Sequence, residues 1–464
     1  MRQGSQGIVG SFFHAPQQGQ LEVLDDVLIV VGDDGIIAAV LSPDHPDRMR
    51  EEIRLSDRLH RLPPYQFGLP GLVDLHVHAP QYPQLGLALD EPLEVWLGKY
   101  TFPLEAKYAD LDFARRRYEV LVDDLIANGT TTALYFATQD REASKLLADI
   151  CIDKGQRALV GKVVMDDPAA CPDDYRDMSA EEAVADTRDV IAHIRNHPRN
   201  RSGRVLPVIT PRFIPSCTDA ALAGLGALAA ECVCHVQTHC SESDWAHHHV
   251  LDRFGITDAA ALDGFGLLTR KTILAHSNFL TDADMDRLVA QGSGVAHCAL
   301  SNIYFANSVF PLRHALEKGV HVGLGTDISG GPSASMFSAC LTSVQSSRLL
   351  EDGVDPARPA PERGRANSAI DLVTAFHLAT AGGGVALDLP IGVLAPGYHF
   401  DAMAVDTSAE DGAIRLFGGE SPGDIFQKII YGATRANIAN VWIDGVPVRV
   451  RPTAAATVEP LPAT

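Results

Sequence analysis

Eight apolar, strand-like runs separated by helix-length sequence are the feature that most constrains how this chain can fold. Each run is rich in β-branched residues, and together they span the middle of the chain from about residue 67 to about residue 390. Eight β/α units in one compact stretch predict an α/β fold with a closed parallel (β/α)8 barrel of the TIM type. An open doubly wound sheet is the alternative, but no glycine-rich dinucleotide fingerprint follows the first run. The expected strands are residues 71–78, 130–138, 158–166, 204–213, 232–242, 272–279, 294–302 and 320–327.

The two ends of the chain resemble each other in kind. Residues 21–41 indicate short β-strands around a tight GDDG turn, and residues 400–406 and 440–450 alternate in the same way. Asp444-Gly445 is a hairpin signal within the last of these segments. We therefore expect both ends to meet in one small β-sandwich domain. The expected division is residues 1–66 and 391–464 for the small domain and residues 67–390 for the barrel.

His76 and His78 close the first strand of the expected barrel. Residues two apart on a strand point to the same face, and two imidazoles on one face suit a divalent metal such as zinc or iron. A His-x-His pair alone is weak evidence, because a structural pair is about as common. This pair follows the apolar run FGLPGLVDL, where burying two histidines without a use would be costly.

Further polar residues end other strands of the expected barrel. In a β/α barrel the carboxyl ends of all strands share one mouth, where active sites lie. Individually, His239 or His276 could be a satisfied core histidine, and Asp327 could cap the next helix. Chance placement of metal-capable residues at four strand ends is the less economical explanation, so we expect one metal centre at the mouth. These strand-end residues are Arg212, His239, Glu242, His276 and Asp327.

Glu242 lies three residues beyond His239. If His239 binds the metal at the end of its strand, Glu242 reaches the same cavity from the following turn, as a proton shuttle should. A solvated loop carboxylate is the alternative.

The charge balance limits the partners. The chain has 59 acidic and 38 basic side chains and a formal net charge of −21, so nucleic acid and anionic membranes are poor partners. A small neutral or cationic substrate fits better, although global charge says little about a local pocket. The N-terminus shows no basic region followed by an apolar segment, and no apolar run approaches membrane-spanning length, so we expect a cytoplasmic protein.

The motifs together resemble the amidohydrolase superfamily, and more closely the guanine deaminases within it. The resemblance covers nearly the whole chain. The superfamily motifs are PGLVDLHVH (70–78), HCSE (239–242), LAHSN (274–278) and GLGTD (323–327). The motifs specific to the deaminases are HAPQY (78–82), WLGKYTFPLEAKY (96–108), GQRALVGKVVMD (155–166) and TPRF (210–213).

The resemblance implies one zinc ion per subunit, with iron as an alternative that the same ligands accept. His276 would be either a further ligand or the residue that directs the attacking water. Dinuclear members carry a carboxylated lysine at the end of the fourth strand, where this chain has Pro211-Arg212-Phe213, so a mononuclear site is expected. A homodimer is also implied. The expected ligands are His76, His78, His239, His276 and Asp327.

The implied reaction is hydrolysis of guanine to xanthine and ammonia. Asp327 would accept the proton of the attacking water, and Glu242 would protonate ring nitrogen N3 and then help to release the amine. Arg212 suits the O6 and N7 acceptors of guanine, and Gln81 can both donate and accept hydrogen bonds. Phe213 would pack against the flat base, and His239 would also face the substrate.

Two other functions stay open. The same barrel and metal would suit 8-oxoguanine, another aminopurine, a pyrimidine or a triazine. Superfamily relatives that lost their ligands act as non-enzymatic assembly proteins, but every expected ligand is present here. Ala299, where the family usually has proline, and the loop ISGGPSASM after Asp327 depart from the usual pattern near the expected pocket.

Overall fold

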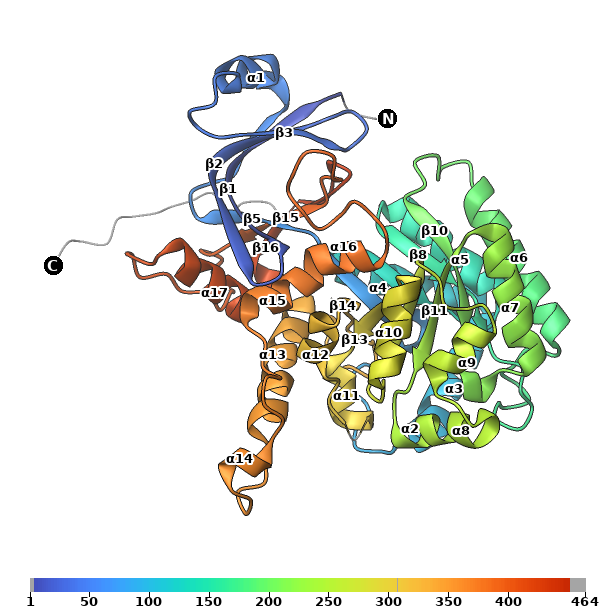
Figure 1. The fold of residues 1–464 in the computed structure, drawn as a ribbon. Helices are drawn as coiled ribbons and strands as arrows, with labels where there is room; N and C mark the ends of the chain where they lie inside the picture. The colour runs from blue at the N-terminus through green and yellow to red at the C-terminus, as the bar shows by residue number, and fades with distance from the viewer. Residues whose placement is uncertain (1–3, 307, 451–464) are drawn as a thin grey trace.

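The computed structural model describes residues 4–306 and 308–450. Eight parallel β/α units form a nearly closed barrel, and the predicted (β/α)8 fold is confirmed (Figure 1). The strands follow chain order around the barrel. The short β9 follows β8 in the chain, and both strands pair with β10. The barrel strands are β6 (Leu72–His78), β7 (Thr130–Phe136), β8 (Arg157–Gly161), β9 (Val163–Val164), β10 (Val205–Pro211), β11 (His235–Cys240), β12 (Thr272–His276), β13 (Gly294–His297) and β14 (His321–Leu324).

Local sequence signals fix the ends of the helices around the barrel. In α10, the Thr281 side chain and Asp284 form a reciprocal capping box, and Gly292 ends the helix with a φ of 70°. The helices of this layer are α4 (Leu111–Ala127), α5 (Arg141–Lys154), α6 (Ala180–Asn196), α7 (Asp219–Cys232), α8 (Asp244–Phe254), α9 (Asp258–Gly264), α10 (Asp282–Gln291), α11 (Ala299–Phe305), α12 (Leu312–Glu317) and α13 (Met336–Asp352).

Shorter helices fill the connections and the small domain. Two of them, α2 and α3, lie in the long segment between β6 and α4, and α14 lies at the tip of an arm that extends beyond α13 (Figure 1). They are α1 (Arg48–Arg54), α2 (Leu93–Trp96), α3 (Phe102–Glu105), α14 (Ala360–Arg363), α15 (Leu372–His377), α16 (Gly383–Ala386) and α17 (Pro422–Gly432). None of the described helices has the length and apolarity needed to cross a bilayer.

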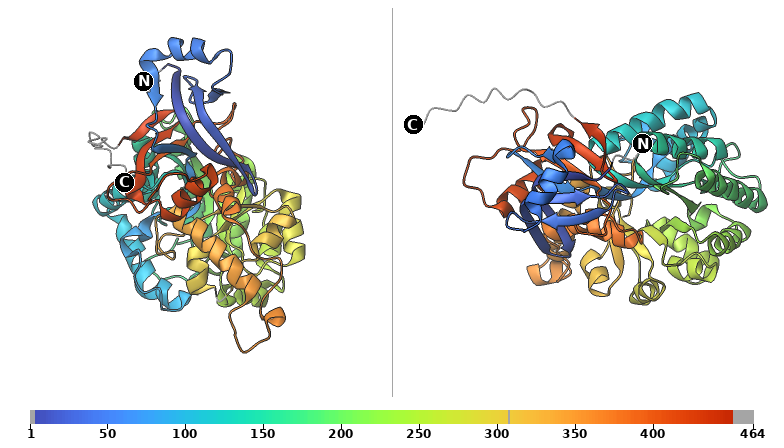
Figure 2. Two further views of the ribbon diagram at one scale, coloured as in Figure 1. Left: turned by 90° about the vertical axis from the view of Figure 1, so that its left-hand side faces the viewer. Right: turned by 90° about the horizontal axis from the view of Figure 1, so that it is seen from above.

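Strands from both ends of the chain pair in a second sheet, which confirms the predicted small β-domain. The N-terminal and C-terminal parts of this sheet meet where β5 (Gln66–Pro70) pairs antiparallel with β15 (Ala402–Asp406). Figure 2 shows the N-terminal strands in blue beside the C-terminal strands in red. The other strands are β1 (Gln6–Gln17), β2 (Gln20–Val31), β3 (Ile37–Leu41), β4 (Leu59–Arg61), β16 (Ile438–Ile443) and β17 (Val446–Val450).

The two expected turns of the small domain are present. Gly35, in the GDDG turn between β2 and β3, has a φ of 87°. Asp444 and Gly445 join β16 to β17 with φ angles of 51° and 73°, and a two-residue hairpin of this kind needs positive φ at both positions. The division of domains at residues 66/67 and 390/391 stays a prediction. Residues 1–3 and 451–464 of the predicted small domain lie outside the described residues.

Buried ion pairs join the small domain to the barrel. Arg157, at the start of β8, donates to both carboxylate oxygens of Asp401 at 2.7 and 3.2 Å and also contacts Asp444. Arg204 donates to Asp444 at 2.8 Å, and His399 lies 2.7 Å from it. Burial alone would raise the pKa of Asp444, but these partners outweigh it and hold that pKa well below its ordinary value.

The substitution Asp444→Asn should therefore destabilise the protein in a pH-dependent way. Asparagine tolerates the positive φ, so the main loss is the charge, and we expect the free energy of unfolding to fall by about 3 kcal/mol at pH 7. A depressed pKa stabilises the fold above the ordinary pKa of about 3.9, and that contribution is lost as the pH falls below it. Urea unfolding should thus show a smaller difference at pH 3. Asp44→Asn, at an exposed position, is the control, and an equal loss at both pH values would contradict the ion-pair explanation.

Candidate active site

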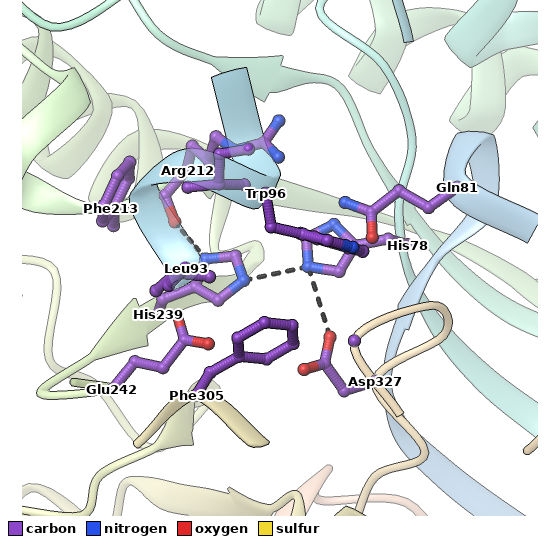
Figure 3. Close-up of a pocket in the computed structure, with 12 residues that line it drawn as sticks. His78, Gln81, Leu93, Trp96, Arg212, Phe213, His239, Glu242, Phe305 and Asp327 are labelled. Carbon is purple, nitrogen blue, oxygen red and sulfur yellow. Dashed lines mark hydrogen bonds and ion pairs between the residues drawn. The ribbon is translucent and has the colours of Figure 1, made fainter. Parts of the chain in front are cut away.

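Four histidines from three strands meet at the mouth of the barrel. His76 and His78 end β6, His239 lies near the end of β11, and His276 ends β12. The Nε2 atoms of His78 and His239 are 2.9 Å apart (Figure 3). The structure thus brings together the histidines that the sequence placed at separate strand ends.

Asp327 completes the cluster from the loop after β14. Its Oδ1 lies 3.2 Å from His76 Nε2 and 3.6 Å from His78 Nε2, and its Oδ2 lies 3.8 Å from His276 Nε2. Ligands about 2.0–2.1 Å from a tetrahedral zinc ion are roughly 3.3–3.4 Å from one another, so these spacings are those of a coordination sphere.

The protonation and hydrogen bonding of the histidines also fit a cation. Burial, reinforced by the neighbouring imidazoles, holds the pKa of His76, His78 and His239 well below its usual value, so the rings are neutral and offer lone pairs. The Nε2 atoms of His76 and His276 are buried and find no hydrogen-bond partner among residues 4–306 and 308–450. Unsatisfied buried nitrogens are costly, and a bound divalent metal would satisfy them.

Hydrogen bonds to the Nδ1 atoms aim two of these rings. His239 Nδ1 is 2.6 Å from the carbonyl oxygen of Arg212, and His276 Nδ1 is 2.9 Å from Asn302 Oδ1. Because Nδ1–H donates in both cases, Nε2 is the free acceptor and faces the cluster. Asn302 is itself held by Asn278, which donates to the Glu242 carbonyl oxygen at 2.9 Å.

The backbone at the mouth is strained. Four non-glycine residues at the ends of strands have φ angles between 46° and 66°, in the left-handed region that costs on the order of 1–3 kcal/mol per residue. Such conformations persist only where the surroundings hold them, and they cluster at functional sites. The four residues are Ser241, His276, Ser277 and Asp327.

Glu242 faces the cluster from the turn after β11. Its Oε1 lies 3.6 Å from His276 Nε2, and the side chain is 10% exposed. Burial and repulsion from Asp327 raise the pKa of Glu242 well above its usual value. Burial also raises the pKa of Asp327, opposed by His276. The carboxyl groups of Glu242 and Asp327 thus lie beside the histidine cluster, as a site that moves protons requires.

A pocket opens directly over these groups. It encloses about 380 Å³ of space, counting its open mouth. The predicted Gln81, Arg212 and Phe213 all line it, as do His78, His239, Glu242 and Asp327 (Figure 3). Polar groups gather at its floor and on one wall, while the other walls are apolar, a combination typical of a small-molecule site. The apolar lining includes Leu93, Trp96, Leu97 and Phe305.

Sequence reasoning missed several residues around this pocket. Asn302, which contacts His276, and Asn278, which holds Asn302, lie within HCALSN and LAHSN, but an asparagine in a motif does not reveal its partner. Glu105 lies in the segment WLGKYTFPLEAKY, yet a single glutamate in a short helix carries no recognisable spacing. Trp96 and Phe305 lie in segments far apart in sequence, and their rings pack 5.3 Å apart.

Comparison with known proteins places this geometry in a family. A model of the amidohydrolase family matches residues 67–448. The probable guanine deaminase of Schizosaccharomyces pombe is 37% identical over 444 residues, covering 94% of this chain and 82% of that protein. The guanine deaminase of Homo sapiens is 35% identical over 446 residues, covering 94% and 95%. The crystal structure of guanine deaminase from C. acetobutylicum with bound guanine superposes with a TM-score of 0.85 at 30% identity, covering 96% of this chain and 100% of that one.

The hydrogen bond from His276 to Asn302 can be tested by Asn302→Ala. Loss of such a partner typically weakens metal affinity by about 10–100-fold, because the ring is no longer aimed and its nitrogen is less basic. Metal retained during competition with a chelator, measured by mass spectrometry, should fall accordingly. Tyr304→Phe, on the same helix but at an exposed position, should leave retention unchanged. Equal retention in both variants would show that Asn302 does not support the site.

Proposed function

The chain belongs to the amidohydrolase family, and on that premise we propose that it is a guanine deaminase, which hydrolyses guanine to xanthine and ammonia. The observation that carries this proposal is that one pocket holds both the groups suited to bind a metal and move protons and the groups suited to recognise a base. Its floor is the cluster of histidines and carboxylates, and its wall carries Arg212 and Gln81. A base bound against that wall would present its ring carbon to the floor.

The recognition groups match one edge of guanine. Guanine offers the O6 and N7 acceptors, and the Arg212 guanidinium supplies donors at fixed positions. Gln81 adds an amide that can donate and accept. Phe213 lies 6.2 Å from the ring of His239, measured between centroids, and would pack against the flat base beside that histidine. Adenine presents an amino donor where guanine presents O6, so this wall would reject it.

We propose that His76, His78, His239, His276 and Asp327 hold one zinc ion. When bound, the metal acts as a Lewis acid that makes water nucleophilic at neutral pH. Lys162, between β8 and β9, is the lysine nearest the position of the carboxylated lysine of dinuclear members. It is buried, and its Nζ donates to Asp177 Oδ1 at 2.5 Å, so it is not free to bind a second metal. This supports a mononuclear site.

The two carboxyl groups would divide the proton transfers. Asp327 accepts a proton from the water that attacks C2 of guanine. Glu242 gives its proton to ring nitrogen N3. As a carboxylate it then takes the proton of the hydroxyl group added at C2 and helps to deliver it to the departing amine, so that water and guanine yield xanthine and ammonia. Their shared neighbour His276 lies 3.6 Å from Glu242 and 3.8 Å from Asp327. A homodimer and a cytoplasmic location stay predictions.

The proposal is tested by measuring metal content and guanine turnover on the same preparation. We expect about one zinc per chain and release of ammonia and xanthine. A panel of 8-oxoguanine, adenine, cytosine and an aminotriazine, assayed by ammonia release, discriminates between substrates. Preference for another base would contradict the assigned substrate but keep the chemistry. Absence of both metal and turnover would favour the assembly-protein alternative.

The proposed role of Glu242 predicts that Glu242→Gln loses catalytic activity but keeps its metal. Proton transfer by a positioned carboxyl group contributes on the order of 10²–10⁴-fold, so we expect kcat to fall by that factor while zinc content stays the same. Glu231→Gln, which changes an exposed carboxylate, is the matched control and should retain full activity. Loss of zinc together with activity would mean that Glu242 supports the metal instead of moving protons.

A further inference from the structure

A buried carboxylate outside the predicted site organises the recognition wall. Glu105, the last residue of α3, is 1% exposed. Its Oε2 accepts from Arg212 Nη1 at 2.7 Å, and its Oε1 accepts from Arg212 Nη2 at 3.2 Å. Gln81 Nε2 donates to the same carboxylate at 2.8 Å, and the Tyr175 hydroxyl donates at 2.6 Å. One side chain therefore contacts both groups expected to recognise the base.

These contacts fix the orientation of both groups. The Gln81 amide must turn its nitrogen to Glu105, and its oxygen then accepts from the Ser329 backbone N–H at 3.2 Å. Glu105 takes one N–H from each terminal nitrogen of Arg212 and leaves other N–H groups for a ligand. The guanidinium is also held over the Phe102 ring, 4.9 Å from its centroid. Neither recognition group can turn without breaking a contact to Glu105.

The same contacts set the charge of the wall. Arg212 is 2% exposed, and an unpaired charge at such a depth would be very costly. Burial alone would lower the pKa of Arg212, but attraction to Glu105 outweighs it, so the guanidinium stays protonated. Tyr175 contributes no charge, because burial and the nearby Glu105 raise its pKa well above its ordinary value. The wall is therefore an ion pair with no net charge.

We propose that Glu105 is the positioning residue that sets specificity for a neutral base. It aims Arg212 and Gln81 at the base, and it cancels the positive charge that would otherwise attract anionic purines. Xanthine ionises more readily than guanine because an electron-withdrawing carbonyl group at C2 replaces the electron-donating amino group. Neutralisation by Glu105 thus weakens binding of the ionised product and favours its release. This inference rests on the proposed deaminase function.

The decisive variant is Glu105→Gln, which keeps the shape and removes the charge. Loss of charge-assisted hydrogen bonds worth about 1.5–3 kcal/mol should raise KM for guanine by about 10–100-fold, while kcat changes much less and zinc content stays the same. Inhibition by xanthine should become tighter than in the wild type, and more so at pH 9 than at pH 6. Unchanged KM together with unchanged xanthine inhibition would overturn the proposal.

A second variant separates position from charge. Glu105→Asp keeps the charge but is one methylene shorter, so it cannot reach Arg212 and Gln81 as Glu105 does. We expect a raised KM without tighter inhibition by xanthine. Because this variant keeps a carboxylate charge near the buried Arg212, it tests the positioning role even where Glu105→Gln does not fold. A wild-type KM in this variant would refute that role.

Two controls exclude a merely structural effect. Asp177→Asn removes another buried carboxylate, which pairs with Lys162 and does not line the pocket; it should lower thermal stability and leave KM unchanged. In the background of Arg212→Ala, Glu105→Gln should add little to KM, because removing both partners of a buried pair leaves no unpaired charge. A full additive loss would show that Glu105 acts apart from Arg212.

Calorimetric titration distinguishes failure of this inference from failure of the proposed function. Xanthine binding can be measured on each variant directly, and guanine binding can be measured in the background of Glu242→Gln, where turnover is slow. If the wild type binds guanine but does not hydrolyse it, the deaminase proposal fails while the binding ratio still tests Glu105. If the ratio of xanthine to guanine affinity is the same in wild type and Glu105→Gln, the specificity role fails even in an active enzyme.

Discussion

The hydrogen bonds that close the barrel between its first and last strands are the constraint on which the site depends. The Asp327 N–H donates to the His76 carbonyl oxygen at 2.8 Å, and the His78 N–H donates to Ile328 at 2.9 Å. Below them, Asp74 is fully buried and accepts from the backbone and hydroxyl of Thr326 at 2.9 and 2.6 Å. Without these hydrogen bonds, the positions of His76, His78 and Asp327 relative to one another would not be fixed.

The closure holds a site that is unfavourable in itself. Neutral imidazoles lie at contact distance, and several of their nitrogens find no hydrogen-bond partner within the described part of the chain. The chain also takes left-handed conformations at His276 and Asp327. A chain selected for stability alone would avoid each of these features. Binding of a metal would relieve these nitrogens, so occupation of the proposed site would couple metal binding to folding.

Periodicity and the positions of strand ends are the parts of this structure that could be predicted from the sequence. The β/α repeat predicts the eight strands, and the two-residue period of a strand predicts the shared direction of His76 and His78. His239, His276 and Asp327 could be placed because parallel strands end at one mouth. The residues that hold these site residues in position could not be predicted in the same way. Glu105 contacts Arg212 and Gln81 from α3 in the long connection after β6, and Asn302 contacts His276 from α11. The path of a connection depends on tertiary packing, which no local pattern encodes.

The arrangement of charge shows how an acidic protein could build a selective pocket for the uncharged base proposed as its substrate. The net charge of −21 lies mainly on the surface, where water and salt screen it. Inside, Arg212 is balanced by Glu105, and the carboxylate of Asp327 faces neutral histidines that can hold a cation. Because the charge of the recognition wall is balanced by Glu105, the direction of hydrogen bonds decides which base fits. A site with fixed donors and acceptors rejects a mismatched base because its own buried polar groups would be left unpaired. Selectivity in this pocket therefore depends on how firmly Arg212 and Gln81 are held, which is why a carboxylate that contacts both of them matters as much as the groups that face the substrate.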